Sequence, residues 1–335
     1  MNKRIVFILP YFGHFKNYFD MFLQSCENNE IYDWIIITDN NISSSASNIT
    51  IVQTTFRALR EKFQSKFDFD ISLDRPYKLC DFKPAYGYLF EEYINGYEYW
   101  GHCDSDVLFG NMPYYLDPLL DAGYDKLFAA GHLTIYKNNI INNRRFMLPD
   151  KEGVFLYRTA LSHSDIFAFD EMYYRKNVHT LFRDSGALVY EKDLSFNIST
   201  RHWGIRRVFY NPASQQWETS THKPRLLVWS GGSIASYHWS LNNNEQTTCK
   251  TWLYVHMQGR AMRRIGGARG NTSIEIGPDY LKPIQRPQMR SATVDIKRAL
   301  EDVSLKSIRR SLGRLSCKLK RLSPTLIDPY ARYIH

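Results

Sequence analysis

The feature that most constrains this chain is a pair of carboxylates, Asp104 and Asp106, placed directly after a short apolar and aromatic stretch. That stretch, residues 97–100, predicts a buried strand, and an apolar run resumes at Val107. Because residues i and i+2 of a strand point to the same side, both carboxylates are expected to face one way. Carboxylates this close repel each other unless a cation lies between them or one is protonated. Oxygen ligands of this kind suit Mg²⁺ or Mn²⁺, so the pattern predicts a divalent metal site, although isolated pairs also occur in solvated turns and helix caps.

The N-terminal part has the pattern of a doubly wound α/β fold. Residues 5–9 are an apolar run stopped by Pro10, and residues 34–38 are a second run that ends at Asp39. Residues 17–28 between them show helical spacing. Continuous apolar runs of this length are typical of strands buried on both faces of a parallel sheet. We therefore predict an α/β fold with a Rossmann-like, mixed and mainly parallel sheet flanked by helices.

The turn after the first predicted strand and the end of the second are candidate ligand contacts. Open α/β sheets bind ligands at the carboxyl ends of their strands. By this rule Asp39, after the second strand, is placed where a nucleoside could be held. A helix-capping role explains Asp39 equally well. The first turn carries no G-x-G-x-x-G and no P-loop motif, which disfavours the glycine-fingerprint dinucleotide fold.

A charged cluster precedes a predicted helix over residues 85–94, whose start is marked by Pro84. Lys78, Asp81 and Lys83 gather just before that helix. A helix N-terminus suits an anion, so these side chains are candidate nucleotide contacts. The alternative is an ordinary charged connection.

Two later groups complete the set of candidates. Residues 166–169 are an apolar run followed by Asp170 and Glu171, and either carboxylate suits a general base, although acids are also favoured at helix N-termini. His256 lies in a strand-like run with Arg260 four residues later. A histidine in such a run is usually a core residue. Beside a metal it would be a nitrogen ligand, with Arg260 as a phosphate clamp.

Composition limits the class of protein. The chain has 335 residues, of which 44% are hydrophobic and 15% aromatic, enough for a large folded core. Its five cysteines are scattered and odd in number, which favours a reducing compartment. No apolar run reaches the length of a membrane span, and the N-terminal apolar run is too short for a signal peptide. We expect a cytoplasmic protein.

The C-terminal segment, residues 286–335, differs from the rest. From Arg290 onward it holds eleven Lys and Arg against four Asp and Glu, with apolar residues at steps of mostly three or four. This pattern predicts a basic amphipathic helical tail. Such a tail suits an anionic membrane surface, or it packs on the main domain with a solvated basic face. Nucleic-acid binding is not expected, because interleaved aromatics and a known module are missing.

The chain resembles a known group of enzymes at four places. Residues 100–107 resemble the Asp-x-Asp strand of GT-A glycosyltransferases. The segments 78–84, 169–171 and 254–256 are similar to an uncharacterised bacterial glycosyltransferase group from polysaccharide clusters, and the resemblance spans residues 1–275. It implies a GT-A-like fold in which the Asp-x-Asp pair binds Mn²⁺ or Mg²⁺ on the donor diphosphate. The implied metal ligands are Asp104, Asp106 and His256, with Asp104 also facing the nucleotide sugar.

The resemblance implies a metal-dependent glycosyltransferase. It would move a sugar from a nucleotide-sugar donor, for which UDP is the favoured nucleotide, to a glycan or lipid-linked acceptor in capsule or O-antigen synthesis. The resemblance further implies that the nucleotide sits against Pro10, Tyr11 and Phe12, which form the turn after the first strand. Residues 1–110 would form the nucleotide-sugar half and residues 111–285 the acceptor half, while the tail would hold the enzyme on the inner face of the cytoplasmic membrane. No Q-x-x-R-W motif occurs, which argues against a processive synthase. A sugar-nucleotide nucleotidyltransferase and a non-catalytic carbohydrate- or nucleic-acid-binding protein stay open as alternatives.

Overall fold

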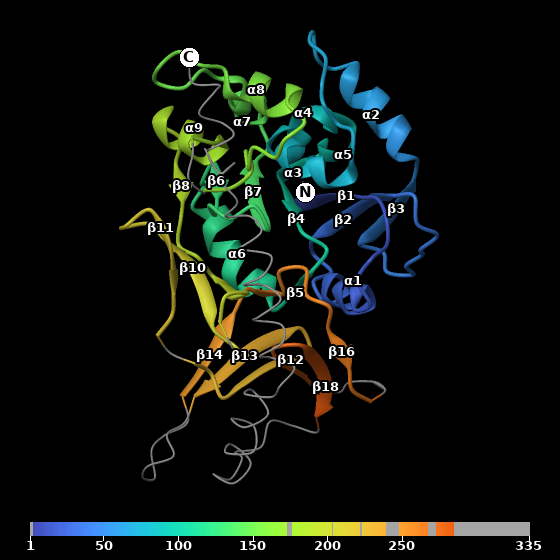
Figure 1. Cartoon of the computed structure of the whole chain (residues 1–335), viewed down its shortest axis with the longest axis vertical. Helices are drawn as coiled ribbons and strands as arrows, with labels where there is room; N and C mark the ends of the chain where they lie inside the picture. The colour runs from blue at the N-terminus through green and yellow to red at the C-terminus, as the bar shows by residue number, and fades with distance from the viewer. Residues whose placement is uncertain are drawn as a thin grey trace, which may run out of the picture.

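The main sheet of the protein is mixed and mainly parallel. The computed structural model describes residues 3–172, 176–202, 204–221, 223–238, 248–266 and 273–284. Its seven-stranded sheet has the order β3-β2-β1-β4-β7-β6-β8 (Figure 1). Strands β3, β2, β1 and β4 are parallel to one another. Strand β7 is antiparallel to β4 and β6, and β8 is parallel to β6. The predicted α/β class with a mainly parallel sheet is therefore confirmed. The bounds are β1 (Lys3–Tyr11), β2 (Asp33–Thr38), β3 (Ile49–Gln53), β4 (Tyr97–Cys103), β6 (Lys126–Leu127), β7 (Leu133–Lys137) and β8 (Val189–Tyr190).

Helices cover both faces of this sheet, which explains the unbroken apolar runs. In β1, Ile5 and Phe7 pack in one core cluster with residues of α1 and α6, while Val6 and Ile8 pack in a second cluster with residues of α2 to α5, α8 and α9. Side chains alternate along a strand, so both sets must be apolar. The helices are α1 (Phe19–Glu27), α2 (Phe56–Gln64), α3 (Leu79–Phe82), α4 (Tyr86–Leu89), α5 (Glu91–Ile94), α6 (Met112–Asp121), α7 (Ile140–Arg144), α8 (Leu156–Ser162) and α9 (Val178–Asp184), with short 3₁₀ turns η1 (Pro76–Lys78), η2 (Lys83–Ala85) and η3 (Arg145–Met147).

The single helix predicted over residues 85–94 is wrong. The chain forms α4 and α5 with a break at Phe90, whose φ and ψ of −128° and 38° are not helical. Phe90 is 1% exposed and packs edge-on against Phe63 in the core. Gly87 in α4 is held close to the main sheet, where a Cβ would lie 2.5 Å from the Trp100 ring. Tertiary packing therefore overrides the helical spacing.

The turn that carries Asp104 and Asp106 is the point where the chain leaves the main sheet. After it, β5 (Val107–Phe109) joins a second sheet of order β11-β10-β9-β15-β5, in which β5 pairs antiparallel with β15 (Tyr254–His256). The other strands of this sheet are β9 (Ser195–Ile198), β10 (Arg207–Asn211) and β11 (Gln216–Thr219). A third sheet lies below it, at the end of the molecule opposite α8 (Figure 1). Its strands are β12 (Leu226–Ser230), β13 (Ser233–His238), β14 (Thr248–Trp252), β16 (Arg263–Arg264), β17 (Ser273–Ile276) and β18 (Tyr280–Ile284).

The two predicted halves of the domain are interlocked. Strands β6, β7 and β8 from beyond residue 110 complete the main sheet, and β5 from before it completes the second sheet. Whether residues 1–110 hold the donor and 111–285 the acceptor stays a prediction. The predicted tail, residues 286–335, lies outside the described residues. Among the residues that are described, no helix has both the length and the hydrophobicity that a bilayer crossing requires.

Candidate active site

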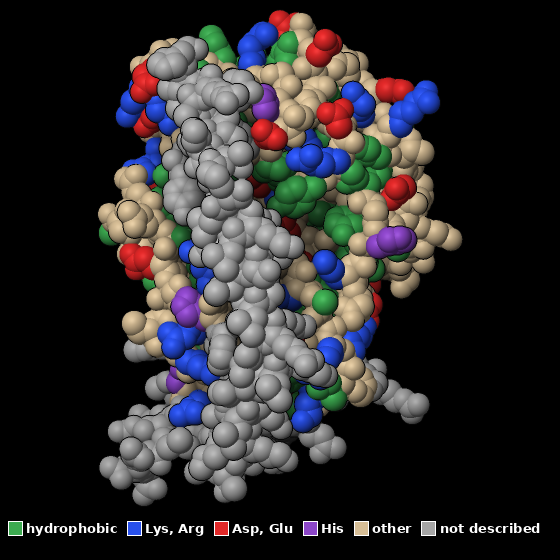
Figure 2. Space-filling view, in the orientation of Figure 1, with side chains coloured by type: hydrophobic (Ala, Val, Ile, Leu, Met, Phe, Trp, Pro, Cys, Tyr) green, Lys and Arg blue, Asp and Glu red, His purple; other side chains and the backbone are tan. Residues whose placement is uncertain are grey.

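One large cavity, about 1300 Å³ in volume, opens where the main sheet meets the second sheet. Figure 2 shows a hollow on this face of the molecule, bordered by hydrophobic and basic side chains. Its walls come from the end of β1, the turn after β4, η1 and α3, the loop before α9, and strands β10, β11 and β15. Most of the predicted site residues line it, namely Pro10, Tyr11, Phe12, Lys83, Asp104, Asp106, Asp170, Glu171 and His256.

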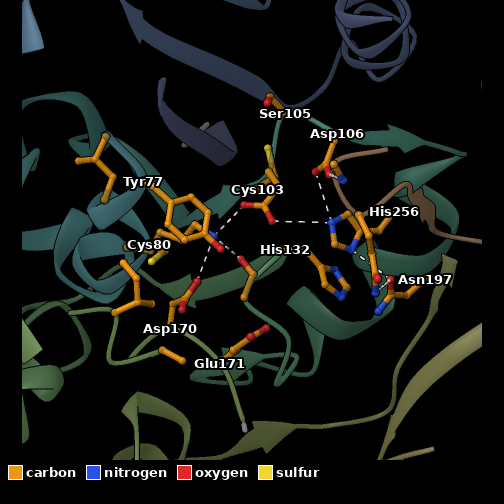
Figure 3. A pocket seen from close by; sticks show the side chains of 18 of the residues that line it. Tyr77, Cys80, Cys103, Ser105, Asp106, His132, Asp170, Glu171, Asn197 and His256 are labelled. Atoms are coloured by element: carbon orange, nitrogen blue, oxygen red, sulfur yellow. Dashed lines mark hydrogen bonds and ion pairs between the residues drawn. The ribbon is translucent and has the colours of Figure 1, made fainter. Parts of the chain in front are cut away.

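The three predicted metal ligands come together in this cavity, and Figure 3 shows Asp106 and His256 next to each other. Each of Asp104, Asp106 and His256 offers one ligand atom, and these atoms lie within 4.8 Å of one another. The His256 Nε2 atom is 3.3 Å from Asp106 Oδ1 and 3.9 Å from Asp104 Oδ2. The register of β15 on β5 causes this, because it pairs His256 with Val107, the residue after Asp106. The two carboxylates lie in a turn rather than on a strand, and both still face the cavity.

Neighbouring groups orient two of these ligands. Asn197 Oδ1 lies 3.1 Å from His256 Nδ1 and also accepts a hydrogen bond from Gln258 Nε2 at 2.7 Å. Because an amide oxygen only accepts, His256 Nδ1 must donate, which leaves Nε2 facing the carboxylates. The Gly259 amide donates to Asp106 Oδ2 and holds that carboxylate in place. Second partners of this kind usually accompany metal-binding histidines.

The charges in the cluster are mutually stabilised. Burial by itself would raise the pKa of Asp106, yet the charge and hydrogen bond of His256, together with the Gly259 amide, lower the pKa below its ordinary value. Burial would lower the pKa of His256, whereas Asp106 and Asp104 raise it overall. The two carboxylates therefore favour the protonated form of His256 as long as no metal is bound. Two carboxylates and one imidazole on a cavity wall also form a donor set that suits Mn²⁺ or Mg²⁺ with open positions for water and phosphate oxygens.

Lys83 joins the metal-ligand cluster to a second acidic group. Its ammonium donates to Asp104 Oδ1 at 2.7 Å, to Asp170 Oδ2 at 3.0 Å and to the Gly131 carbonyl at 2.9 Å. Burial by itself would lower the pKa of Lys83, but the two carboxylates raise it well above its ordinary value. Burial raises the pKa of Asp170, and Lys83 opposes part of that rise. Burial likewise raises the pKa of Glu171. The site thus holds a continuous cluster in which Asp104 lies between His256 and Lys83, and Lys83 links Asp104 to Asp170.

The prediction that Lys78 and Asp81 contact a bound anion is wrong. Both side chains are buried away from the cavity, at 1% and 0% exposure, and form an ion pair of 2.7 Å. Lys78 Nζ also donates to the carbonyls of Ala160 and Asp165, and the Asp81 carboxylate accepts the amides of Phe167 and Phe169. All three N–H donors of the Lys78 ammonium are used, and both Asp81 oxygens accept hydrogen bonds within the protein. This pair, which we call the loop clip, fastens the segment that carries Lys83 to the loop that carries Asp170.

Two other predicted contacts do not line the cavity. The Arg260 guanidinium donates to the carbonyls of Ile198, Ser199 and Met257, so the structure does not support its predicted role as a phosphate clamp. Asp39 is exposed and accepts hydrogen bonds from the Gly13 amide and the Asn40 side chain. Its contact with Gly13, whose φ is +97°, shapes the loop after β1. Asp39 therefore supports the loop after β1, and its direct contact with a nucleotide stays a prediction.

Sequence reasoning missed several cavity-lining residues, including Tyr77, Asn197, Arg201, Trp217 and Lys16. Lys16 and Arg201 are cations for which no carboxylate partner is found within 4.0 Å in the described part of the chain. Asn197 lies in an ordinary strand pattern, and only the pairing of β9 with β15 places it beside His256. No local sequence signal marks these residues.

Replacing Asn197 with Ala is expected to weaken Mn²⁺ binding by about 10- to 100-fold, because His256 loses the partner that fixes its ring. Titration calorimetry with MnCl₂ measures this directly. Asn211→Ala is the matched control, since Asn211 lies in the same sheet and its side chain bonds Glu218 instead. Equal Mn²⁺ affinities for the wild type and the Asn197 variant would contradict the assigned role.

Comparison with known proteins adds a family and a set of distant structures. A family model described as a family of unknown function (DUF6625) matches residues 7–285. None of the curated proteins matches the sequence. The chain is similar to the structure of the galactosyltransferase LgtC with donor and acceptor sugar analogs, at 13% identity over 58% of this chain and 75% of that one, with a TM-score of 0.32. Mouse xyloside xylosyltransferase 1 in its apo form gives 9% identity, coverage of 60% and 88%, and a TM-score of 0.32. An active-site mutant of LgtC gives 15% identity, coverage of 59% and 79%, and a TM-score of 0.31. Similarity at this level assigns no function, so the case for one rests on the geometry of the site.

Proposed function

The chain belongs to the DUF6625 family, and from the geometry of its site we propose that it is a divalent-metal-dependent glycosyltransferase. The donor is a nucleotide sugar, with UDP as the nucleotide we favour, and the acceptor is a glycan or a lipid-linked saccharide of cell-surface polysaccharide synthesis. The observation that supports this most directly is the meeting of Asp104, Asp106 and His256 in a large cavity, with Asp170 joined to Asp104 through Lys83 and Glu171 lining the same cavity.

Asp104, Asp106 and His256 would hold Mn²⁺ or Mg²⁺. When bound, such an ion supplies Lewis-acid stabilisation of the leaving diphosphate. Lys16 and Arg201 take the place that the sequence suggested for Arg260, because they line the same cavity and are cations without a carboxylate partner among the described residues. They would neutralise further phosphate charge. The backbone turn of Pro10, Tyr11 and Phe12 would contact the nucleoside.

The neighbouring carboxylates of Asp170 and Glu171 would act on the acceptor. The C1–O bond to the diphosphate breaks with its electron pair on the diphosphate oxygen, and the acceptor oxygen forms a new bond to C1. For inversion of configuration, the hydroxyl proton passes to a carboxylate. We favour Glu171 over Asp170 for this step, because Asp170 is 4% exposed and accepts from Lys83, whereas Glu171 is more accessible. Burial raises the pKa of Glu171 toward the range of an effective base.

Residues 286–335 belong to the proposal as a membrane anchor, since eleven basic residues from Arg290 onward suit an anionic leaflet at about 1 kcal/mol each. A chain ending after Ile284, which keeps β18, is expected to lose binding to vesicles that contain anionic lipid. Co-sedimentation with such vesicles measures the loss, and full-length protein is the control. Unchanged co-sedimentation of the shortened chain would exclude the anchor.

The proposed activity is tested by UDP release from UDP-hexoses with and without Mn²⁺, together with thermal unfolding in the presence of UDP and Mn²⁺. Ligands that bind the folded state stabilise it by about 2.7 kcal/mol at one hundred times the dissociation constant. We expect stabilisation only when both ligands are present, and metal-dependent UDP release. A carbohydrate-binding protein would release no UDP. A nucleotidyltransferase would instead form pyrophosphate from a nucleoside triphosphate and a sugar phosphate.

A further inference from the structure

Two aromatic side chains, Tyr77 and Trp217, line the same cavity as Asp170 and Glu171. Tyr77 lies in η1 and is 74% exposed, although it lines the cavity. Figure 3 shows it on the side of Cys80 and Asp170, across the cavity from His256 and Asn197. A single exposed aromatic ring is common on protein surfaces, but this one also lines the cavity, where it is available to a ligand.

Trp217 in β11 is the second aromatic residue, and the fold holds it rigidly. Its Nε1 atom donates to the carbonyl of Met172, the residue after Glu171, at 2.6 Å. Its ring centroid lies 6.0 Å from that of Tyr210 and 6.3 Å from that of His132. The indole is partly exposed and lines the cavity. A fixed aromatic ring beside Glu171 can present its face to a substrate without losing side-chain entropy on binding.

The polar groups in this part of the cavity are largely uncharged. Gln216 and Thr219 on β11 line the cavity, and His132, whose ring lies beside Trp217, is 3% exposed. The His132 Nε2 atom is buried and has no hydrogen-bond partner among the described residues. Of the described cations that line the cavity, Lys83 is bound by Asp104 and Asp170. The other described cations that line the cavity are Lys16, which follows the β1 turn, and Arg201, which follows β9.

We propose that the region bordered by Tyr77 and Trp217 is the acceptor subsite and that it takes an uncharged pyranoside. This inference rests on the proposed transferase function and adds the class of its acceptor. The C–H face of a pyranose ring is apolar and packs on an aromatic face, while its hydroxyls pair with neutral donors and acceptors such as Gln216 and Thr219. A phosphorylated acceptor would instead meet the carboxylates of Asp170 and Glu171, and the Lys83 ammonium is already bound by Asp104 and Asp170.

The test uses full-length protein, UDP-hexoses with Mn²⁺, and two acceptor probes: p-nitrophenyl pyranosides and pyranosyl phosphates. Tyr77→Ala and Trp217→Ala are each expected to raise the KM for the pyranoside about tenfold, the loss of one aromatic contact. Trp217→Phe keeps a ring and is expected to recover most of that affinity, which a merely structural role for the indole hydrogen bond would not predict. Tyr114→Ala is the matched control, because Tyr114 in α6 is 70% exposed and lies outside the cavity.

The possible outcomes separate this inference from the proposed function. If the wild type releases UDP with Mn²⁺ but pyranosides neither become glycosylated nor slow that release, the subsite is wrong and the transferase function stands. An unchanged KM in both alanine variants, or a clear preference for pyranosyl phosphates, also overturns the subsite. If the wild type shows no metal-dependent UDP release and no stabilisation by UDP with Mn²⁺, the proposed function itself fails. Stabilisation by UDP with Mn²⁺ in each variant shows that it is folded.

Discussion

Asp106→Asn is expected to lower metal-dependent UDP release by about 10³-fold or more, because a Lewis-acid metal lowers the activation barrier by several kcal/mol. The substitution keeps the shape of the side chain and one acceptor for the Gly259 amide but removes the charge beside His256. His256 then loses the main carboxylate that raises its pKa. We also expect the stabilisation by UDP with Mn²⁺ to disappear in thermal unfolding, while the metal-free protein keeps its fold.

Asp121→Asn is the control for this prediction. Asp121 is also a carboxylate paired with a cation, Arg4, but its side chain is 69% exposed on α6. Its variant should behave as the wild type in both measurements, because exposed pairs contribute about 0–1 kcal/mol. If UDP with Mn²⁺ stabilised Asp106→Asn as much as the wild type, the ion would bind elsewhere, and the proposed site would have to be abandoned.

Asp81→Asn is expected to destabilise the protein by about 3–5 kcal/mol, the usual cost of breaking a buried ion pair from one side. The substitution leaves the Lys78 ammonium at 1% exposure without its counter-charge and turns an amide N–H toward donors. It also weakens the anchoring of Phe167 and Phe169 just before Asp170. Urea unfolding followed by circular dichroism measures the stability, and UDP release measures the effect on the site.

The chain contains a closely matched control for this second prediction. Asp150 also accepts two backbone amides and a lysine, Lys176, but that lysine is 40% exposed. Asp150→Asn should cost less, because water solvates the lysine that it leaves behind. The double variant Lys78→Met/Asp81→Asn should recover part of the lost stability while UDP release stays below the wild-type rate. If Asp81→Asn is as stable as Asp150→Asn, the loop clip does not have the energetic role assigned to it.

Much of the main sheet could be predicted from local pattern. The unbroken apolar runs of β1 and β2 indicated strands covered on both faces, and helices cover both faces. The failure at Phe90 has a physical cause, since helical spacing does not reveal that one aromatic ring must leave the helix to fill the core. The alternation rule for Asp104 and Asp106 indicated a shared direction, and both line the cavity even though the chain turns there.

The charged candidates show where local pattern stops. Lys78, Asp81 and Lys83 lie within six residues and looked equivalent, yet two form the buried loop clip and the third faces the cavity. A cluster before a helix carries no information on which side chain is solvated. The spacing of Arg260 from His256 predicts a phosphate contact, but the Arg260 guanidinium donates a hydrogen bond to the Ser199 carbonyl instead.

By itself the sequence determined which segments around the site form strands and which form helices, because apolar residues recur every two positions in a strand and every three to four in a helix. It also determined that two carboxylates follow the end of a buried strand. The tertiary structure decided which distant residues meet them. Lys83 and Asp170 are 87 residues apart and Asn197 and His256 are 59 apart. Their contacts depend on the register of β15 against β5 and β9 and on the loop clip. Periodicity shows which face of a strand is buried. Which distant residues contact that face is decided only when the whole chain packs, and the chemistry of this cavity depends on those contacts.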